Sequence, residues 1–257
     1  MTGDGGRVPG VGCRRFRKEA GKLTHLVLFD IDGTLLTASG AGRRALERAL
    51  ASCFGVTGQL DGRDFAGKSD PVIFREAAVR LGVGLQELQA GWEQLVGRYL
   101  QFLDEELAQR QVRALAGVAC LLAHLKRRPD VMLGLGTGNL EQAAWRKLRA
   151  AGLESYFRVG GFGADGEDRV EILRAAFRRA CSGNGVPHDV VVVGDTPLDV
   201  QAAHRAGFAA VAVATGPYSV EELQNSGPEA VLPDLACWAE AARVLLEAAA
   251  RRRQVFQ

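Results

Sequence analysis

The sequence HLVLFDIDGTLL, residues 25–36, runs from a short apolar segment into two aspartates and a glycine. Residues 25–29 have the length and the unbroken apolar character of a strand that is buried on both faces. Asp30 and Asp32 follow at once, and Gly33 predicts a tight turn behind them. Ligands of open α/β sheets bind outside the carboxyl ends of the strands, so we expect both aspartates at a ligand site.

Strand and helix patterns alternate along the second half of the chain. Strand patterns occupy 131–139, 156–163, 189–195 and 209–216, and helical patterns occupy 140–153, 169–181 and 197–207. Repeated βα units of this length predict a parallel, doubly wound sheet, to which the strand at 25–29 belongs by its composition. The expected fold class is therefore α/β with a Rossmann-like core.

About 100 residues between the first strand and the strand at 131 have a different pattern. Helical spacing occupies 42–55, 70–82, 85–109 and 118–128, and no β-rich run interrupts it. A parallel crossover needs only about a dozen residues, so the remainder predicts an inserted all-helical domain. The expected division is a disordered extension at 1–22, a core domain at 23–38 and 115–257, and a helical domain at 39–114.

Composition narrows the class of protein. The 257 residues are 47% hydrophobic and 24% charged, with a net charge of +2, which is ordinary for a globular protein. No apolar stretch reaches the roughly 20 residues that span a bilayer, and no hydrophobic segment indicates a secretory signal. The five cysteines are scattered and form no CxxC pair, which suits a reducing compartment. We expect a cytoplasmic monomer or homodimer without a nucleic-acid or membrane partner.

Two of the predicted strands deliver acidic side chains to one edge of the sheet. Asp30 and Asp32 follow the first strand, and Asp195 and Asp199 follow the strand at 189–194. Carboxylates gathered at one edge repel each other unless a cation lies among them. Hard oxygen ligands without His or Cys favour Mg²⁺ as that cation. For Asp199 alone, capping of the following helix is an equally good interpretation.

Donors for an anion follow a third strand. Thr137, Gly138 and Asn139 come after the strand at 131–136, and Arg169 begins the helix at 169–181. Hydroxyl, amide and guanidinium groups are the donors that bind phosphoryl oxygens. Thr137 and Asn139 are also common turn residues, so they indicate phosphate only together with the acidic groups.

Three motifs then carry a family resemblance. DIDGT (30–34), TGN (137–139) and GDTPLD (194–199), in this order on successive βα units, resemble the haloacid dehalogenase superfamily. The similarity runs from about Leu26 to Leu235, and the helical insertion is similar to the cap of the phosphoglycolate phosphatase and β-phosphoglucomutase branch. The resemblance implies a Mg²⁺-dependent phosphatase of a small phosphorylated metabolite, with phosphoglycolate as the first candidate.

The resemblance implies different catalytic roles for the two aspartates of the first motif. Asp30 is the expected nucleophile, which attacks phosphorus and becomes an aspartyl phosphate. Asp32 is the expected acid/base, which protonates the leaving group and later deprotonates the hydrolytic water. Dehalogenases and phosphonatases of the superfamily lack this acid/base, so Asp32 favours hydrolysis of a phosphate ester. A sugar-phosphate mutase uses the same residues and stays an alternative.

A third interpretation is a non-catalytic, receiver-like module in which Asp30 is only a phosphorylation switch. Such a module needs neither Asp32 nor a large helical insertion that excludes water, so the sequence disfavours it.

The same resemblance implies a metal site. Mg²⁺ is expected between the Asp30 carboxylate, the Asp32 backbone carbonyl and Asp195, with Asp199 as an outer ligand or an orienting group. Gly33 is expected to let the backbone turn close to the phosphoryl group that Thr137, Gly138 and Asn139 hold.

The cation beside the nucleophile departs from the commonest family pattern. Many relatives carry Lys followed by Pro at this point, whereas this chain has Asp168-Arg169 at the start of a helix. We expect Arg169 to neutralise the phosphoryl oxygens or to pair with Asp30, as a lysine would. Lys147 is the alternative, although its mid-helix position makes it the weaker candidate. A plain surface position for Arg169 is the remaining interpretation.

Substrate choice is expected to depend on the helical domain. Residues 67–70, GKSD, precede a predicted helix with Pro71 at its first turn. Lys68 is a candidate to meet a carboxylate or other second anion of the substrate, which suits phosphoglycolate; an exposed lysine before a helix is the equal alternative. Trp92, Tyr99 and Phe102 recur at helical spacing and are expected in the core rather than as a ligand platform.

Overall fold

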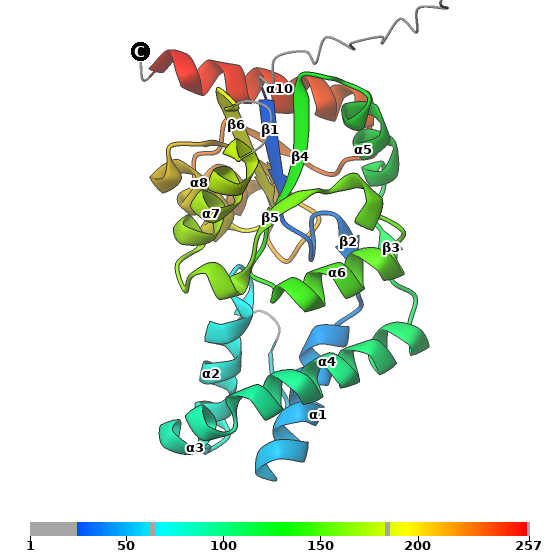
Figure 1. Cartoon of the computed structure of the whole chain (residues 1–257). Helices are drawn as coiled ribbons and strands as arrows, with labels where there is room; N and C mark the ends of the chain where they lie inside the picture. The colour runs from blue at the N-terminus through cyan, green and yellow to red at the C-terminus, as the bar shows by residue number, and fades with distance from the viewer. Residues whose placement is uncertain (1–24, 62–64, 183–185, 256–257) are drawn as a thin grey trace, which may run out of the picture.

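The structure is a computed structural model that describes residues 25–61, 65–182 and 186–255, with side chains described as far as residue 251. The extension expected at 1–22 lies outside the described residues. Within the described part, a six-stranded parallel sheet carries helices on both faces, and a group of helices extends beyond one edge of that sheet (Figure 1).

The sheet places β1 at its centre. In spatial order the parallel strands are β5 (Val159–Gly161), β4 (Val131–Gly136), β1 (His25–Phe29), β6 (Asp189–Gly194), β7 (Ala209–Val213) and β8 (Ala230–Leu232). Phe29 of β1 is in register with Leu135 of β4 and with Val193 of β6. The segments that follow these three strands therefore emerge side by side. The chain winds first to one side of β1 and then to the other, which confirms the predicted doubly wound α/β fold.

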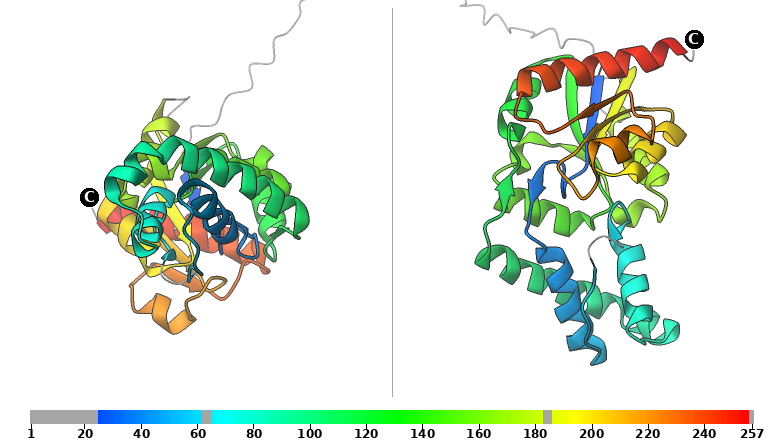
Figure 2. Two further views of the ribbon diagram at one scale, coloured as in Figure 1. Left: turned by 90° about the horizontal axis from the view of Figure 1, so that it is seen from below. Right: turned by 180° about the vertical axis from the view of Figure 1, so that it is seen from behind.

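Helices cover the sheet on both faces (Figures 1 and 2). They are α5 (Val118–Lys126), α7 (Arg169–Cys181), α8 (Pro197–Ala206), α9 (Val220–Gln224) and α10 (Trp238–Val255), whereas α6 (Glu141–Ala150) runs beneath the carboxyl edge of the sheet. Val27 and Phe29 belong to the hydrophobic cluster that includes α5 and α10, whereas Leu26 and Leu28 belong to the cluster that includes α7 and α8. Because successive side chains of a strand alternate between faces, burial on both faces requires the unbroken apolar run of β1.

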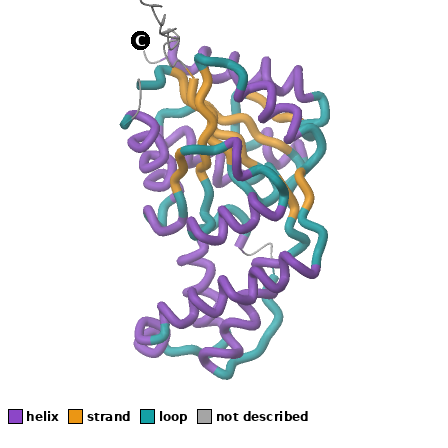
Figure 3. The backbone as a smooth tube through the Cα atoms, turned by 45° about the vertical axis from the view of Figure 1, so that its right-hand side comes forward, coloured by secondary structure: helices purple, strands orange, loops and turns teal. Residues whose placement is uncertain are grey.

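The helical insertion, by which we mean α1 to α4, lies beyond the carboxyl ends of the strands (Figure 3). Its helices are α1 (Ala41–Phe54), α2 (Asp70–Arg80), α3 (Leu85–Ala90) and α4 (Trp92–Gln109). The single helix expected at 85–109 is wrong, because Gly91 separates α3 from α4. A Cβ at Gly91 would lie 2.8 Å from the ring of Phe54, the last residue of α1. The break between α3 and α4 therefore lies where α1 packs closely against the chain.

Two short strands close the base of the helical insertion. β2 (Leu36–Thr37) and β3 (Arg113–Ala114) pair in antiparallel fashion where the chain leaves and rejoins the core. These strands were not predicted, because two residues are too short to leave a periodic pattern. The domain boundaries expected after 38 and after 114 fall beside this pair and stay a prediction.

Further differences from the expected elements lie at the later strands. The strand expected at 156–163 is only β5, because 3₁₀ turns at Glu154–Tyr156 and Gly163–Asp165 flank it. β8, α9 and α10 follow the last predicted strand and were not predicted. Along the described part of the chain, we find no helix with both the length and the apolar character to span a bilayer.

Candidate active site

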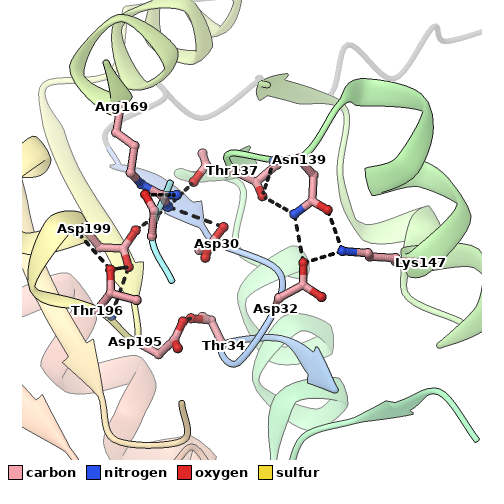
Figure 4. A network of polar contacts seen from close by, with 12 residues as sticks. Asp30, Asp32, Thr34, Thr137, Asn139, Lys147, Arg169, Asp195, Thr196 and Asp199 are labelled. Carbon is pink, nitrogen blue, oxygen red and sulfur yellow. Dashed lines mark hydrogen bonds and ion pairs between the residues drawn. The ribbon is translucent and has the colours of Figure 1, made fainter. Parts of the chain in front are cut away.

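Three buried carboxylates meet where β1 and β6 end. Asp30, Asp195 and Asp199 each offer a carboxylate oxygen, and these oxygens lie within 4.8 Å of one another. Asp30 follows β1 directly, Asp195 follows β6, and Asp199 lies in the first turn of α8 (Figure 4). Carboxylate oxygens at this spacing fit a hard divalent cation such as Mg²⁺.

Burial and mutual repulsion disfavour the ionised form of this cluster. Burial raises the pKa of Asp30 to about 6 against the attraction of Arg169, and the charges of Asp199 and Asp32 add to the rise. Burial raises the pKa of Asp195 to about 8, with Asp199 and Asp30 adding to it. A divalent cation among the carboxylates supplies the positive charge that this cluster lacks, so the donor set fits Mg²⁺.

Asp199 also caps α8. Its Oδ2 accepts from the backbone N of the N-cap residue Thr196 at 3.0 Å, and the Asp199 backbone N donates to Thr196 Oγ1 at 3.3 Å, which together form a capping box. Its Oδ1 accepts a hydrogen bond from Arg169. Both interpretations of Asp199 therefore apply, because the same carboxylate caps the helix and lies in the acidic cluster.

The turn after β1 brings the backbone against Asp195. Gly33 has a φ of 81°, and a Cβ at this position would lie 2.4 Å from Asp195 Oδ2. Glycine is therefore required here by backbone conformation and by space. Thr34 Oγ1 donates to Asp195 Oδ1 at 3.0 Å. Thr34 was not predicted as a site residue, although the DIDGT motif contains it.

Arg169 reaches Asp30 from the start of α7. Its side chain is 8% exposed, and its Nη2 lies 3.4 Å from Asp30 Oδ1. The same guanidinium pairs with Asp199 and donates from Nη1 to the Gly67 carbonyl at 3.2 Å. Burial alone would lower the pKa of Arg169, but the carboxylates of Asp199 and Asp30 outweigh it and raise that pKa. Arg169 is thus no surface helix residue.

The carboxylate of Asp32 takes a different direction from that of Asp30 (Figure 4). Its Oδ2 accepts hydrogen bonds from Asn139 Nδ2 at 2.9 Å and from Lys147 Nζ at 2.6 Å. Lys147 Nζ also donates to Asn139 Oδ1 at 2.6 Å, and Asn139 Nδ2 donates to Thr137 Oγ1 at 2.9 Å. The chain Thr137–Asn139–Asp32 therefore connects the turn after β4 with the turn after β1.

Lys147 is placed differently from what its mid-helix position suggested. α6 runs beneath the carboxyl edge of the sheet, so its inner face points at the site rather than at solvent (Figure 1). Burial alone would lower the pKa of Lys147, but the charges of Asp32 and Asp70 raise it. Arg169 and Lys147 are therefore not alternatives, because one cation faces Asp30 and the other faces Asp32.

A cavity of about 320 Å³ opens between this edge of the sheet and the helical insertion. Asp30, Asp32, Asn139 and Arg169 line it from the core. α1, α2, α4 and the segment before α2 supply a largely apolar opposite wall, which includes Leu46, Phe65, Ile73, Phe74 and Tyr99. The site is thus a pocket with polar groups on one side and apolar groups on the other, the usual character of a small-molecule site.

The residues of the helical domain that were singled out in the sequence, Lys68 and three aromatic residues, differ in how they are placed. Lys68 lines the cavity, and its Nζ pairs with Glu76 at 2.7 Å. Tyr99 is 2% exposed and packs edge-on against Phe74 at 4.7 Å between ring centroids, as expected of a core residue, although it also lines the cavity. Trp92 and Phe102 pack against the hydrophobic cluster that contains Phe74 and Tyr99.

Comparison with known proteins identifies the family. The family model described as haloacid dehalogenase-like hydrolase matches residues 24–207, which is most of the chain. The chain belongs to the haloacid dehalogenase-like hydrolases. This membership confirms the resemblance that the three motifs suggested.

Individual relatives of this haloacid dehalogenase-like hydrolase span nearly its whole length. Phosphoglycolate phosphatase of Synechococcus elongatus is 31% identical over 212 residues, which cover 80% of this chain and 91% of that protein. Phosphoglycolate phosphatase of Pseudomonas savastanoi pv. phaseolicola is 30% identical over 224 residues, which cover 84% of this chain and 79% of that protein. The crystal structure of CbbY from Rhodobacter sphaeroides in complex with phosphate has the same fold, with a TM-score of 0.67 at 21% identity, and the match covers 83% of this chain and 96% of that chain.

The structure brings together all ten predicted site residues of this hydrolase. They line the cavity or touch its carboxylates, and they are Asp30, Asp32, Gly33, Lys68, Thr137, Gly138, Asn139, Arg169, Asp195 and Asp199. Asp70 also lines the cavity and was not predicted; burial raises the pKa of Asp70 to about 6. As the first residue of a helix beside Pro71, it has the sequence pattern of an ordinary helix start, which hid it.

Proposed function

We propose that this hydrolase is a Mg²⁺-dependent phosphatase of small phosphorylated metabolites that works through an aspartyl phosphate on Asp30. The observation that carries the proposal is the divergence of the two aspartates of the first motif. Asp30 faces Arg169 and the acidic cluster, whereas Asp32 faces Asn139 and Lys147 across the same cavity. A nucleophile and an acid/base need this separation, because they act on opposite sides of one P–O bond.

The proposed reaction has two steps. The Asp30 carboxylate attacks phosphorus, the bond from phosphorus to the leaving oxygen breaks, and that oxygen takes a proton from Asp32. Asp32 then removes a proton from a water molecule, whose oxygen attacks phosphorus and releases inorganic phosphate and the free Asp30 carboxylate. Lys147 and Asn139 hold Asp32 toward the cavity during both proton transfers.

Binding of the phosphoryl group is assigned to the donors around Asp30. The guanidinium of Arg169 offers charged N–H groups beside Asp30, the Thr137 side chain hydrogen-bonds to Asp30, and Gly138 and Asn139 line the cavity. Asp30, the Asp32 carbonyl, Asp195 and Asp199 would hold Mg²⁺, which supplies positive charge for the phosphoryl oxygens when it is bound.

Phosphoglycolate is the first substrate to test, because two relatives that cover most of this chain are phosphoglycolate phosphatases. The cavity of about 320 Å³ accommodates a leaving group larger than glycolate, so other small esters belong in the same panel. A cytoplasmic location and a monomeric or homodimeric state remain part of this proposal. Membership of a hydrolase family argues against the receiver-like switch.

The first experiment measures phosphate release from phosphoglycolate, a set of sugar phosphates and an aryl phosphate, with Mg²⁺ and with a chelator. Wild type is compared with Asp30→Asn, which keeps the shape of the side chain and removes the nucleophile. Asp104→Asn is the matched control, because Asp104 is an exposed carboxylate of α4. We expect Mg²⁺-dependent release that Asp30→Asn reduces by at least about 10³-fold and Asp104→Asn leaves within about twofold.

Two outcomes would contradict the proposal. Substantial release by Asp30→Asn would remove Asp30 as the nucleophile. Isomerisation of a sugar phosphate without release of phosphate would replace the phosphatase by a mutase.

A further inference from the structure

Residues 67–70 of the chain reach from the helical insertion onto the turn after β4. The Asp70 backbone N donates to the Gly138 carbonyl at 2.7 Å, and Asp70 Oδ2 accepts from the Leu140 backbone N at 2.8 Å. These two hydrogen bonds bracket Asn139. They connect the first residue of α2 with the turn that we assign to phosphoryl binding, across 70 positions of sequence.

The contact is tight on both sides. A Cβ at Gly138 would lie 2.4 Å from the Lys68 carbonyl oxygen, and a Cβ at Gly67 would lie 2.7 Å from Thr196 Oγ1. Arg169 adds a hydrogen bond to the Gly67 carbonyl at 3.2 Å. Residues 67–70 thus touch the turns after β4 and β6 and the start of α7, which carry the proposed active site.

Ordinary helix capping does not account for Asp70. The cap position of α2 is Ser69, whose side chain makes no capping hydrogen bond. Ser69 Oγ is buried without a hydrogen-bond partner among the described residues, whereas the Asp70 carboxylate accepts from the core. The side-chain hydrogen bond of this segment therefore runs from Asp70 to the core, whereas the neighbouring Ser69 hydroxyl makes no hydrogen bond among the described residues.

Among the described residues, the ion pairs between side chains of the helical insertion and side chains of the core are more exposed. Arg75 pairs with Glu167, with side chains 46% and 62% exposed, and Arg146 pairs with Asp104. Exposed ion pairs contribute little, because water and salt screen them. Asp70 is 9% exposed, so its hydrogen bond to Leu140 is shielded from that competition.

We propose that Asp70 is a positioning residue that docks the helical insertion on residues 137–140 and so holds that turn in its phosphoryl-binding conformation. The expected effect on the kinetics rests on the proposed function, whereas the docking of Asp70 on residues 137–140 does not. Asp70 acts through Gly138 and Leu140 rather than on the substrate. Because Leu140 precedes α6, the same contact also fixes the start of the helix that carries Lys147.

The test compares Asp70→Ala, Asp70→Asn and Ser69→Ala in the full chain with Mg²⁺ present. Asp70→Ala removes the acceptor, Asp70→Asn keeps an oxygen in its place, and Ser69→Ala removes a hydroxyl that has no hydrogen-bond partner among the described residues. Hydrogen exchange of the Leu140 amide, with inorganic phosphate present, reports the docking. The kinetics of phosphate release report the effect of the docking on catalysis. Hydrogen exchange of a peptide from β7 serves as an internal reference for the stability of the core.

We expect Asp70→Ala to speed exchange at Leu140 and to lower kcat/KM by about 10- to 100-fold, the range set by one hydrogen bond to a charged group. Asp70→Asn should recover most of both losses, and Ser69→Ala should match wild type. A loss of stability alone would speed exchange in β7 as well and would not be rescued by Asn.

Exchange at Leu140 that is unchanged in Asp70→Ala would overturn the docking. Faster exchange at Leu140 with unchanged kcat/KM would overturn its role in positioning. If wild type hydrolyses no ester, the proposed function fails, and the exchange experiment still decides whether Asp70 docks the helical insertion.

Discussion

Single residues at the carboxyl edge have partners that their sequence positions do not reveal. Arg169 and Lys147 each bind a different aspartate of the first motif, so the site contains two fixed cations. The cation beside Asp30 is the guanidinium of Arg169. Its planar fork contacts Asp30 and Asp199 through Nη2 and the Gly67 carbonyl through Nη1.

Lys68 allows a prediction about substrate charge. Its Nζ is paired with Glu76, and both side chains are about one-third to one-half exposed, at 34% and 46%. We expect Lys68→Ala to raise KM for a carboxylated phosphoester by about threefold to tenfold, because an exposed charge pair is worth about 1 kcal/mol. KM for an aryl phosphate, which lacks a carboxylate, should stay unchanged. Steady-state kinetics with both esters provides the measurement.

Glu76→Gln is the matched variant for this test. It releases Lys68 from its partner without changing the size of the side chain, so it should lower KM for the carboxylated ester. Equal effects of Lys68→Ala on both esters would dismiss Lys68 as a specificity residue.

At the scale of elements, α1 and α4 are joined by a partly buried charge network. Glu106 of α4 is 6% exposed and accepts from Arg44 at 2.7 Å, from Arg110 at 3.2 Å and from Arg48 at 3.3 Å. We expect Glu106→Ala to lower the free energy of unfolding by about 1–3 kcal/mol, because it leaves partly buried arginines without their acceptor. Denaturant unfolding provides the measurement.

Glu105→Ala is the control for this prediction. Glu105 is adjacent, its side chain is 40% exposed, and it pairs only with Arg48 among the ion pairs described for it. Its loss should change the free energy of unfolding by less than about 0.5 kcal/mol. Similar effects of the two variants would show that the buried network adds nothing beyond surface pairing.

At the scale of the whole molecule, the acidic cluster couples stability to pH and Mg²⁺. The pKa values of Asp30 and Asp195, about 6 and about 8, lie above the ordinary value of 3.8. The folded state therefore binds these protons more tightly than the unfolded state. This contribution to stability is complete below about pH 4 and is lost as pH rises through about 6 and then about 8.

Bound Mg²⁺ should offset that loss, since it favours the ionised carboxylates. We expect Mg²⁺ to raise Tm more at about pH 8 than at about pH 5.5. Thermal unfolding with Mg²⁺ and with a chelator at both pH values provides the measurement. Asp195→Asn should reduce the difference, and an equal Mg²⁺ effect at both pH values in wild type would contradict the coupling.

Some site residues could be predicted from the sequence and others could not. Asp30, Asp195 and Asn139 were placed at one edge, because parallel strands in register deliver the residues after them to the same place. Lys147 was ranked below Arg169, because helical spacing tells which residues share a face but not what that face meets. Asp70 was missed for the same reason.

The sequence by itself determined the doubly wound sheet, the edge that carries the site and the oxygen-rich chemistry of that edge. Those features follow from local apolar patterns and from the chemical groups at strand ends, which are written in contiguous residues. Only the tertiary structure decided which cation faces which aspartate and that Asp70 of the helical insertion contacts Gly138 and Leu140. Such pairings depend on how separately formed elements pack, and packing brings together side chains that lie far apart in sequence.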